Sequence, residues 1–354
     1  MKKSFLITTG GSGGHVIPAL ILYEHLSKEA NVIITTDKRG LKYLDDEFYK
    51  CKIINTPRLD NIFLLPFNMI KIIILTLKSL FLLKNKKVEK IFSTGGYMSL
   101  PLILAGKILK LEIFLLEPNQ VLGRANKYFL SSCKKIFCYN KKIINFPKNL
   151  LNKMVIINPL VRENIYKFKS SGRVKDKFTI LIIGGSQSAS IFDMNLKNSI
   201  VNISKKKPIK IIQQTNKENV SYLKDFYSKN NIENKIFNFE NNFENIIKDV
   251  DLCITRSGAS TLAELSVINI PFIAVPLPTS KDNHQLENAN FYKENDCCWV
   301  IEQTNFEKKI EYLLNEILID KIEYLKKKEN LKKLNYQNTW INVNQKILEI
   351  INEN

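Results

Sequence analysis

The sequence is poor in residues that cross-link a fold or hold a metal. Its six cysteines include no Cys-x-x-Cys pair, and the chain has only three histidines. Disulfide-rich domains and zinc sites use cysteines at characteristic spacings, which are missing here. The cysteine pattern therefore excludes a disulfide framework and a cysteine-based zinc site, and it is typical of a protein in a reducing cytosol.

The start of the chain also lacks a secretion signal. Residues Met1–Ser4 carry two lysines, but the apolar run that follows, Phe5–Ile7, is too short for a signal peptide. We interpret this run as a first strand and expect no export.

Residues 62–83 are apolar over a length that could span a membrane, but one proline, Pro66, and polar side chains interrupt them. A lysine at the centre of a bilayer costs about 2.5–3.5 kcal/mol, which argues against a transmembrane helix. The spacing instead predicts a polar stripe along an amphipathic helix, formed by Asn68, Lys71, Lys78 and Asn85. The positions expected to contact the membrane are Ile70, Ile73, Ile74, Leu77, Phe81 and Lys84. We expect partial burial plus interfacial membrane contact, with complete burial on the sheet as the alternative.

Acidic residues are scarce in one half of the chain. Up to Val161 there are 25 lysines and arginines against 10 acidic residues, whereas the remainder has 28 against 24. A basic domain suits nucleic acid, an anionic membrane or phosphorylated substrates, although solvated lysines in a lysine-rich composition would give the same count. No aromatic-basic motif supports nucleic acid, so we expect no nucleic-acid partner.

Short apolar runs alternate with longer helical stretches, which predicts α/β domains with parallel sheets. The expected strands are Phe5–Thr8, Val32–Thr35, Lys90–Ser93, Ile113–Leu116, Ile136–Cys138, Thr179–Ile183, Lys210–Gln213, Asp251–Thr255 and Phe272–Val275. The pattern restarts after Asn158-Pro159, so we expect domains at 1–160 and 161–354. A final helix at about 335–354 is expected to pack back on the first domain.

Three glycine loops follow predicted strands. The first, Gly10–His15, has neither the Gly-x-G-x-x-Gly spacing of dinucleotide enzymes nor the Lys-Ser/Thr of a P-loop. The second begins at Gly184-Gly185-Ser186, and the third runs from Arg256 to Glu264. Glycines before a helix start let a phosphate approach the backbone, so the loops indicate phosphate or diphosphate ligands. For Ser260 and Glu264 a capping box is the structural alternative.

The order and spacing of six motifs resemble the bacterial N-acetylglucosaminyltransferases that make lipid II in peptidoglycan synthesis. The motifs are Gly10-Gly11-Ser12-Gly13-Gly14-His15, Gly95-Gly96-Tyr97 with Pro101, Glu117-Pro118-Asn119, Gly184-Gly185-Ser186-Gln187, Arg256-Ser257-Gly258-Ala259 with Glu264, and His284-Gln285 with Asn288-Ala289. The chain departs from the family at Ser188, where a glycine is usual, and by one extra residue in Asn158–Arg162.

The resemblance implies a glycosyltransferase-B fold, with two Rossmann-like domains whose parallel sheets face a cleft. It also implies an inverting transfer of N-acetylglucosamine from UDP-N-acetylglucosamine to the C4 hydroxyl of undecaprenyl-pyrophosphoryl-MurNAc-pentapeptide (lipid I). The first domain would bind the acceptor and an anionic membrane surface, and the second would bind the UDP-sugar. The enzyme would be peripheral on the cytoplasmic face of the inner membrane and could meet other cell-wall or division enzymes there.

The resemblance also assigns site residues. Donor contacts are expected at Ser12, Gly13, Gly14, Asn119, Arg162, Ser186, Glu240, Ala259, Ser260, Thr261, Leu262, Ala263, Glu264, Gln285 and Asn288. Acceptor contacts are expected at Gly11, Tyr97 and Asn126, and the loop Ser12–Gly14 is expected to face the acceptor as well.

Inversion requires a base at the acceptor hydroxyl and hydrogen-bond donors at the departing diphosphate. The catalytic candidates are His15, as the base, and Glu117, as a rival base or an orienting partner. Asp249-Val250-Asp251 fits the Asp-x-Asp string of metal-dependent transferases, but it leads into a hydrophobic strand, so we interpret it as a strand entry. We expect no essential metal and no cofactor, since helix dipoles, hydroxyls and backbone amides would serve instead.

Four other functions remain to be tested. A UDP-N-acetylglucosamine 2-epimerase would share the architecture without needing a membrane face. A glucosyl- or galactosyl-diacylglycerol transferase would keep that face, and a nucleic-acid-binding protein would show steep salt dependence. A nicotinamide dehydrogenase is disfavoured by the spacing of the first glycine loop.

Overall fold

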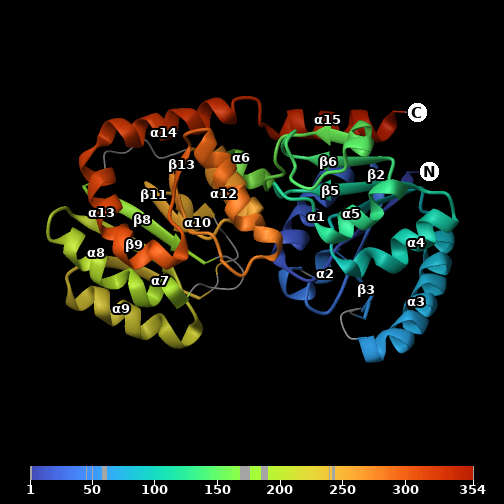
Figure 1. The fold of residues 1–354 in the computed structure, drawn as a ribbon, viewed down its shortest axis with the longest axis horizontal. Helices are drawn as coiled ribbons and strands as arrows, with labels where there is room; N and C mark the ends of the chain where they lie inside the picture. Colours follow the sequence, from blue (N-terminus) through green and yellow to red (C-terminus); the bar gives the residue numbers. More distant parts are fainter. Residues whose placement is uncertain are drawn as a thin grey trace. The chain divides into compact units, whose positions relative to one another are not determined.

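The computed structural model describes residues 2–44, 46–49, 51–57, 62–167, 176–184, 190–238, 240 and 244–353. The chain divides into two compact units (Figure 1). Unit 1 comprises Met1–Leu160 with Ile341–Asn354, and unit 2 comprises Val161–Trp340. Each unit is built around one parallel sheet.

Unit 1 has a seven-stranded sheet in the order β3-β2-β1-β4-β5-β6-β7. Its strands are β1 (Lys3–Thr8), β2 (Ala30–Thr36), β3 (Lys52–Ile53), β4 (Lys90–Ser93), β5 (Glu112–Glu117), β6 (Lys135–Cys138) and β7 (Met154–Ile156). Its helices are α1 (Gly13–Leu26), α2 (Asp46–Tyr49), α3 (Leu65–Asn85), α4 (Leu100–Ile108) and α5 (Arg124–Phe129). All strands are parallel, but successive strands are added on one side of β1 as far as β3 and then on its other side from β4 onward. Ligands of such sheets bind at this switch point between β1 and β4, outside the carboxyl ends of the strands.

The core of unit 1 contains a row of phenylalanines on neighbouring strands. The ring of Phe92 lies 5.7 Å from that of Phe5 and 5.2 Å from that of Phe114, and Phe137 continues the row at 6.0 Å. All four side chains are buried. Burial of such large rings stabilises the sheet and holds the loops that follow β1, β4 and β5 in place.

Unit 2 has a six-stranded sheet in the order β10-β9-β8-β11-β12-β13. Its strands are β8 (Phe178–Ile183), β9 (Ile209–Gln214), β10 (Glu233–Phe237), β11 (Leu252–Thr255), β12 (Phe272–Ala274) and β13 (Cys298–Val300). Its helices are α6 (Glu163–Lys167), α7 (Ser190–Asn195), α8 (Lys197–Ser204), α9 (Val220–Lys229), α10 (Glu244–Ile247), α11 (Ala259–Val267), α12 (His284–Glu294), α13 (Phe306–Ile319) and α14 (Lys321–Leu334). The switch point lies between β8 and β11, so the second and third glycine loops again follow the two strands that flank it.

The last helix, α15 (Trp340–Asn352), belongs to unit 1 from Ile341 onward. Lys90 donates a hydrogen bond to the carbonyl of Ile351 at 2.7 Å, and Lys134 donates to the carbonyl of Glu353 at 2.7 Å. Both lysines also bind the carboxylate of Glu112 on β5. Cations at a helix C-terminus complement the helix dipole, so these lysines attach the end of the chain to the first sheet.

Candidate active site

The first glycine loop joins β1 to α1 and is held by a carboxylate from the neighbouring strand end. Asp37 follows β2, and its Oδ1 accepts hydrogen bonds from the backbone N–H groups of Gly11 and Gly40, each at 2.9 Å. Gly11 has a φ of +86°, a conformation that favours glycine. Burial raises the pKa of Asp37, but these amides and the Arg39 side chain outweigh it and hold that pKa below its usual value.

The predicted base, His15, lies in the first turn of α1 and contacts the loop after β4. Its Nδ1 is 2.8 Å from the carbonyl oxygen of Thr94. A carbonyl can only accept, so Nδ1 carries the hydrogen, and Nε2 is the acceptor atom of the neutral ring. This is the tautomer that a general base needs if Nε2 faces the substrate.

Gly95 and Gly96, in the loop after β4, both have positive φ, at +95° and +85°. A Cβ added to Gly95 would lie 3.1 Å from His15 Cε1, whereas a Cβ on Gly96 would come no closer than 3.5 Å to any atom, the nearest being the Gly10 carbonyl oxygen. The imidazole therefore packs against a loop position that only glycine leaves open.

Glu117, the second catalytic candidate, ends β5 with its carboxylate buried among donors. The backbone N–H of Gly123 donates to it at 2.7 Å, and the side chain of Asn126 donates at 2.9 Å. Asn119 donates both its backbone N–H, at 3.2 Å, and its side-chain amide, at 3.0 Å. A carboxylate with this many donors is suited to orienting Asn119 and Asn126.

The side chain of Asn126 is only partly hydrogen-bonded within the described residues. Its amide nitrogen donates to the Leu116 carbonyl and to Glu117, but its buried Oδ1 has no hydrogen-bond partner within the described ranges. Its Nδ2 would be 3.7 Å from a Cβ on Gly95, the same position that His15 approaches. An unsatisfied buried acceptor is costly unless a ligand completes it, and Asn126 Oδ1 is chemically suited to accept a hydrogen bond from a hydroxyl.

In unit 2, the loop after β8 is only partly described. Gly184 is described and buried, but the predicted donor contact Ser186 and the atypical Ser188 lie outside the described residues. Glu240, expected near the uracil, follows β10 and lies 3.8 Å from the Lys235 ammonium. These positions add no geometry to the donor site.

The third glycine loop follows β11 and leads into α11, whose N-cap is Gly258. Gln285 accepts hydrogen bonds from the backbone N–H groups of Ser257, at 3.2 Å, and Leu277, at 3.0 Å. Asn288 donates to the Ser257 carbonyl at 3.1 Å. Gln285 and Asn288, predicted to bind sugar hydroxyls, therefore also shape the loop. The buried Ser257 hydroxyl has no partner in the part of the chain that is described.

Glu264 is buried in the second turn of α11 and pairs with Arg162. The guanidinium binds the carboxylate through two hydrogen bonds, Nε to Oε1 at 2.7 Å and Nη2 to Oε2 at 2.8 Å. The N-cap of α11 is Gly258, which has no side chain, so the capping-box alternative for Ser260 and Glu264 is wrong. The bidentate pair fixes the Glu264 carboxylate, whose remaining lone pairs can still accept from a ligand.

The Asp-Val-Asp string lies at the opposite end of the sheet from the glycine loops. The Asp251 carboxylate accepts the backbone N–H of Thr179 at 2.9 Å, just before β11 begins. This position agrees with a strand entry. Within the described ranges no three histidine, cysteine or acidic side chains form a group suited to a metal; the absence of a metal requirement remains a prediction.

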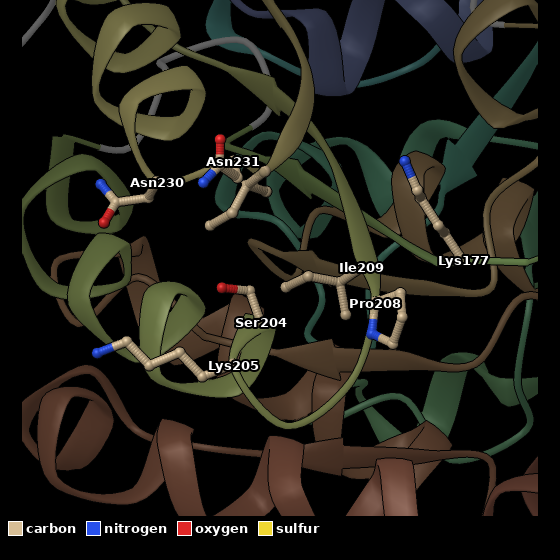
Figure 2. Close-up of a pocket in the computed structure, with 8 residues that line it drawn as sticks. Lys177, Ser204, Lys205, Pro208, Ile209, Asn230 and Asn231 are labelled. Carbon is tan, nitrogen blue, oxygen red and sulfur yellow. The ribbon is translucent and has the colours of Figure 1, made fainter.

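A cavity of about 230 Å³ also opens at that amino end of the unit 2 sheet (Figure 2). Lys177, Pro208 and Ile209 line it where β8 and β9 begin, and Asn230 and Asn231 line it from the end of α9. Of these two parallel strands, β8 carries the second glycine loop at its other end. We therefore do not assign this cavity to the donor.

The predicted membrane helix, α3, exposes its apolar residues. Phe67, Ile70, Ile73, Leu77 and Phe81 are between 56% and 73% exposed, and Lys84 is exposed beside them. Asn68 was predicted on one polar stripe with two lysines, and this is wrong: Asn68 is buried with Ile72, Thr76, Ser79 and Leu83, while Lys71 and Lys78 are exposed. By length and composition α3 could cross a membrane, alone among the described helices.

Two protein-family models match the chain. The glycosyltransferase family 28 N-terminal domain matches residues 5–138, and the family 28 C-terminal domain matches residues 179–339. The UDP-N-acetylglucosamine--N-acetylmuramyl-(pentapeptide) pyrophosphoryl-undecaprenol N-acetylglucosamine transferase of Pelagibacter ubique is 48% identical over 100% of both chains. The protein of the same name from Rickettsia canadensis is 39% identical over 86% of this chain and 87% of its own.

Solved structures show the same fold at low identity. Acinetobacter baumannii MurG has a TM-score of 0.77 at 22% identity, with 99% of each chain covered. The UDP-GlcNAc 2-epimerase from Neisseria meningitidis, bound to UDP-GlcNAc, has a TM-score of 0.67 at 13% identity, covering 99% of this chain and 100% of its own. The predicted glycosyltransferase-B fold with two Rossmann-like parallel sheets is confirmed.

Proposed function

Since this chain belongs to glycosyltransferase family 28, and within it to the N-acetylglucosamine transferases named above, we propose that it makes lipid II. In this reaction N-acetylglucosamine passes from UDP to the C4 hydroxyl of undecaprenyl-pyrophosphoryl-MurNAc-pentapeptide with inversion at the sugar carbon. The observation that carries the proposal is the 48% identity over the full length of both chains. The fold alone would not suffice, because an epimerase shares it.

We assign the UDP-sugar to unit 2. The first amides of α11, from Ala259 onward, have no carbonyl partners within the helix and can donate to the diphosphate. The same donors stabilise the negative charge that grows on UDP as it departs. Glu264, held by Arg162, is placed to accept the ribose hydroxyls. No cofactor takes part in this scheme.

We assign proton removal to His15 of unit 1. As the acceptor hydroxyl attacks, Nε2 takes its proton, and the Nδ1–H keeps its hydrogen bond to the Thr94 carbonyl, which favours the imidazolium that forms. Glu117 acts indirectly, because its hydrogen bonds orient the side chains of Asn119 and Asn126. In this orientation the Asn119 side chain can hydrogen-bond to a sugar, and the Asn126 Oδ1 can accept a hydrogen bond from a substrate hydroxyl.

The apolar face of α3 supports peripheral attachment to the inner membrane. Exposed isoleucines and phenylalanines gain by insertion among lipid chains, and the exposed Lys84, Lys86 and Lys87 contribute about 1 kcal/mol each near anionic headgroups. Crossing the bilayer would remove Ile72 and Leu83 from the core of unit 1. We therefore favour an interfacial position at the cytoplasmic face, where the lipid acceptor presents its sugar.

The test is transfer of labelled N-acetylglucosamine to a lipid I analogue, with UDP-glucose and UDP-galactose as competing donors. We expect lipid II only with UDP-N-acetylglucosamine and only when the acceptor is present. A sugar product formed without acceptor would indicate an epimerase. A preference for the other two donors with diacylglycerol would indicate the related lipid transferases, and either result would refute the proposal.

A further inference from the structure

Arg39, which the motifs do not include, is held rigidly beside the first glycine loop. Its Nε donates to Asp37 Oδ2 at 2.7 Å, and its Nη2 donates to the Tyr97 hydroxyl at 3.0 Å. The guanidinium carbon also lies 5.6 Å from the centre of the Tyr97 ring. A long side chain fixed at two points loses little further freedom when it binds a ligand, so Arg39 is preorganised.

The guanidinium still has donors to offer. Its side chain is 43% exposed, and its Nη1 has no hydrogen-bond partner among the residues that the structure describes. The Asp37 hydrogen bond raises the pKa of Arg39, so the side chain stays charged. Because Asp37 already balances this charge, Arg39 would act through directed hydrogen bonds more than through net attraction.

Asp37 holds both the first glycine loop and Arg39 in place. Asp37 receives the Gly11 amide on Oδ1 and Arg39 on Oδ2, and a Cβ on Gly11 would lie 3.4 Å from the Arg39 Nη2. The guanidinium therefore lies against the loop at its positive-φ glycine. The next residues open α1 at Gly13, where amides lack helical partners. Arginine donors and open amides together are suited to phosphate oxygens.

We propose that Arg39, steadied by Asp37 and Tyr97, binds the diphosphate of the lipid acceptor. This inference rests on the proposed function, which involves two diphosphates: that of UDP, assigned to the loops of unit 2, and the pyrophosphate that links undecaprenol to the acceptor sugar. Arg39 belongs to unit 1, together with the predicted acceptor contacts Gly11 and Tyr97. The diphosphate at Arg39 is therefore that of the acceptor.

The first experiment compares steady-state kinetics of Arg39→Gln with those of Lys38→Gln, which removes the same charge from an exposed neighbour. Hydrogen bonds to charged groups are strong, so we expect Arg39→Gln to raise the KM for a lipid I analogue about ten- to hundredfold. The KM for UDP-N-acetylglucosamine should stay within twofold, and Lys38→Gln should change neither constant. Tyr97→Phe, which keeps the ring, should raise the acceptor KM by a smaller factor. Equal effects of Arg39→Gln and Lys38→Gln, or a rise in the donor KM alone, would overturn the inference.

A second experiment measures binding of inorganic pyrophosphate by calorimetry with saturating UDP, which occupies the donor site. Wild-type protein should bind pyrophosphate, and Arg39→Gln should bind it at least tenfold more weakly at an unchanged thermal unfolding midpoint. Vesicles of anionic lipid without acceptor should bind both proteins equally, since headgroup phosphates are not the ligand. Equal pyrophosphate binding by both proteins refutes the inference even if lipid II is made, whereas absence of transfer by the wild type refutes the proposed function.

Discussion

The two units share one architecture, but different kinds of side chain hold the loops that follow their strands. In unit 1, carboxylates hold the loops: Asp37 binds the Gly11 amide, and Glu117 binds Asn119. In unit 2, neutral amides do this work, since Gln285 and Asn288 bind the backbone of Ser257. A parallel sheet supplies the switch point, and the residues that line the loops decide which ligand it can accept.

The two parts of the chain also differ in charge. The first 161 residues carry 25 basic against 10 acidic side chains, and the remainder carries 28 against 24. Unit 1 also exposes the apolar face of α3. Acidic residues in unit 1 are few, and two of them, Asp37 and Glu117, hydrogen-bond to the candidate site residues Arg39 and Asn126. The contrast agrees with the proposal that unit 1 binds the anionic, lipid-linked acceptor and unit 2 the nucleotide sugar.

The sharpest contrast is between two histidines, one in each unit, whose rings make the same kind of hydrogen bond. His15 and His284 both place Nδ1 2.8 Å from a backbone carbonyl. We expect His15→Ala to lower kcat by about 10²–10⁴-fold because a general base is lost, and His284→Ala to lower it less than tenfold. Initial rates at saturating substrates measure both. Similar losses in the two variants would remove the catalytic assignment.

The donor side is tested at Glu264. Glu264→Gln keeps the shape but weakens the pair with Arg162 and the acceptor capacity for ribose, so the KM for UDP-N-acetylglucosamine should rise about ten- to hundredfold. The acceptor KM should change less than twofold. Glu329→Gln, an exposed carboxylate of α14 in the same unit, is the control and should behave as wild type. An unchanged donor KM in Glu264→Gln would contradict the assignment.

The loop after β4 offers a pair of glycines that both have positive φ but have different neighbours. Gly95→Ala and Gly96→Ala both place alanine at positive φ, but only the Gly95 methyl would press on His15. We expect kcat to fall about tenfold further in Gly95→Ala than in Gly96→Ala, because the ring must leave the Thr94 carbonyl. Comparison of kcat at matched unfolding midpoints decides this. Equal losses would mean that strain alone matters.

The smallest expected effect concerns the membrane. Ile70 on α3 is 57% exposed and Ile322 on α14 of unit 2 is 82% exposed, so both can become serine without leaving a cavity. Ile70→Ser should weaken binding to anionic vesicles about threefold to tenfold, in proportion to a partly inserted side chain. Ile322→Ser should leave vesicle binding unchanged in co-sedimentation. A larger effect at Ile322 than at Ile70 would indicate that unit 2 contacts the membrane, which contradicts the proposal.

Most of the sheet framework could be predicted from the sequence. The nine expected strands are present within two residues, because buried parallel strands appear as short apolar runs between helices. The strands β3, β7, β10 and β13 were not predicted. At β10 the reason is visible: Glu233, Asn234 and Lys235 make it a polar edge strand that covers little of the core.

The site was predictable only where glycines and a resemblance marked it. Arg39 and Tyr97 are 58 residues apart, and nothing in either local pattern indicates their hydrogen bond. The bidentate pair of Arg162 and Glu264 likewise joins residues far apart in the sequence. For α3 the pattern predicts an amphipathic helix, but the buried face was misplaced. Three polar side chains pack inward together with two apolar ones, while most of the large apolar side chains face outward.

The central claim is that each unit binds one substrate, and the double variant Arg39→Gln/Glu264→Gln tests it most directly. Independent sites give additive effects, so the acceptor KM of the double variant should equal that of Arg39→Gln and its donor KM that of Glu264→Gln. Both constants come from one set of initial-rate measurements. If either single change raises both constants, or if the double variant departs from additivity, the assignment of one substrate to each unit is wrong.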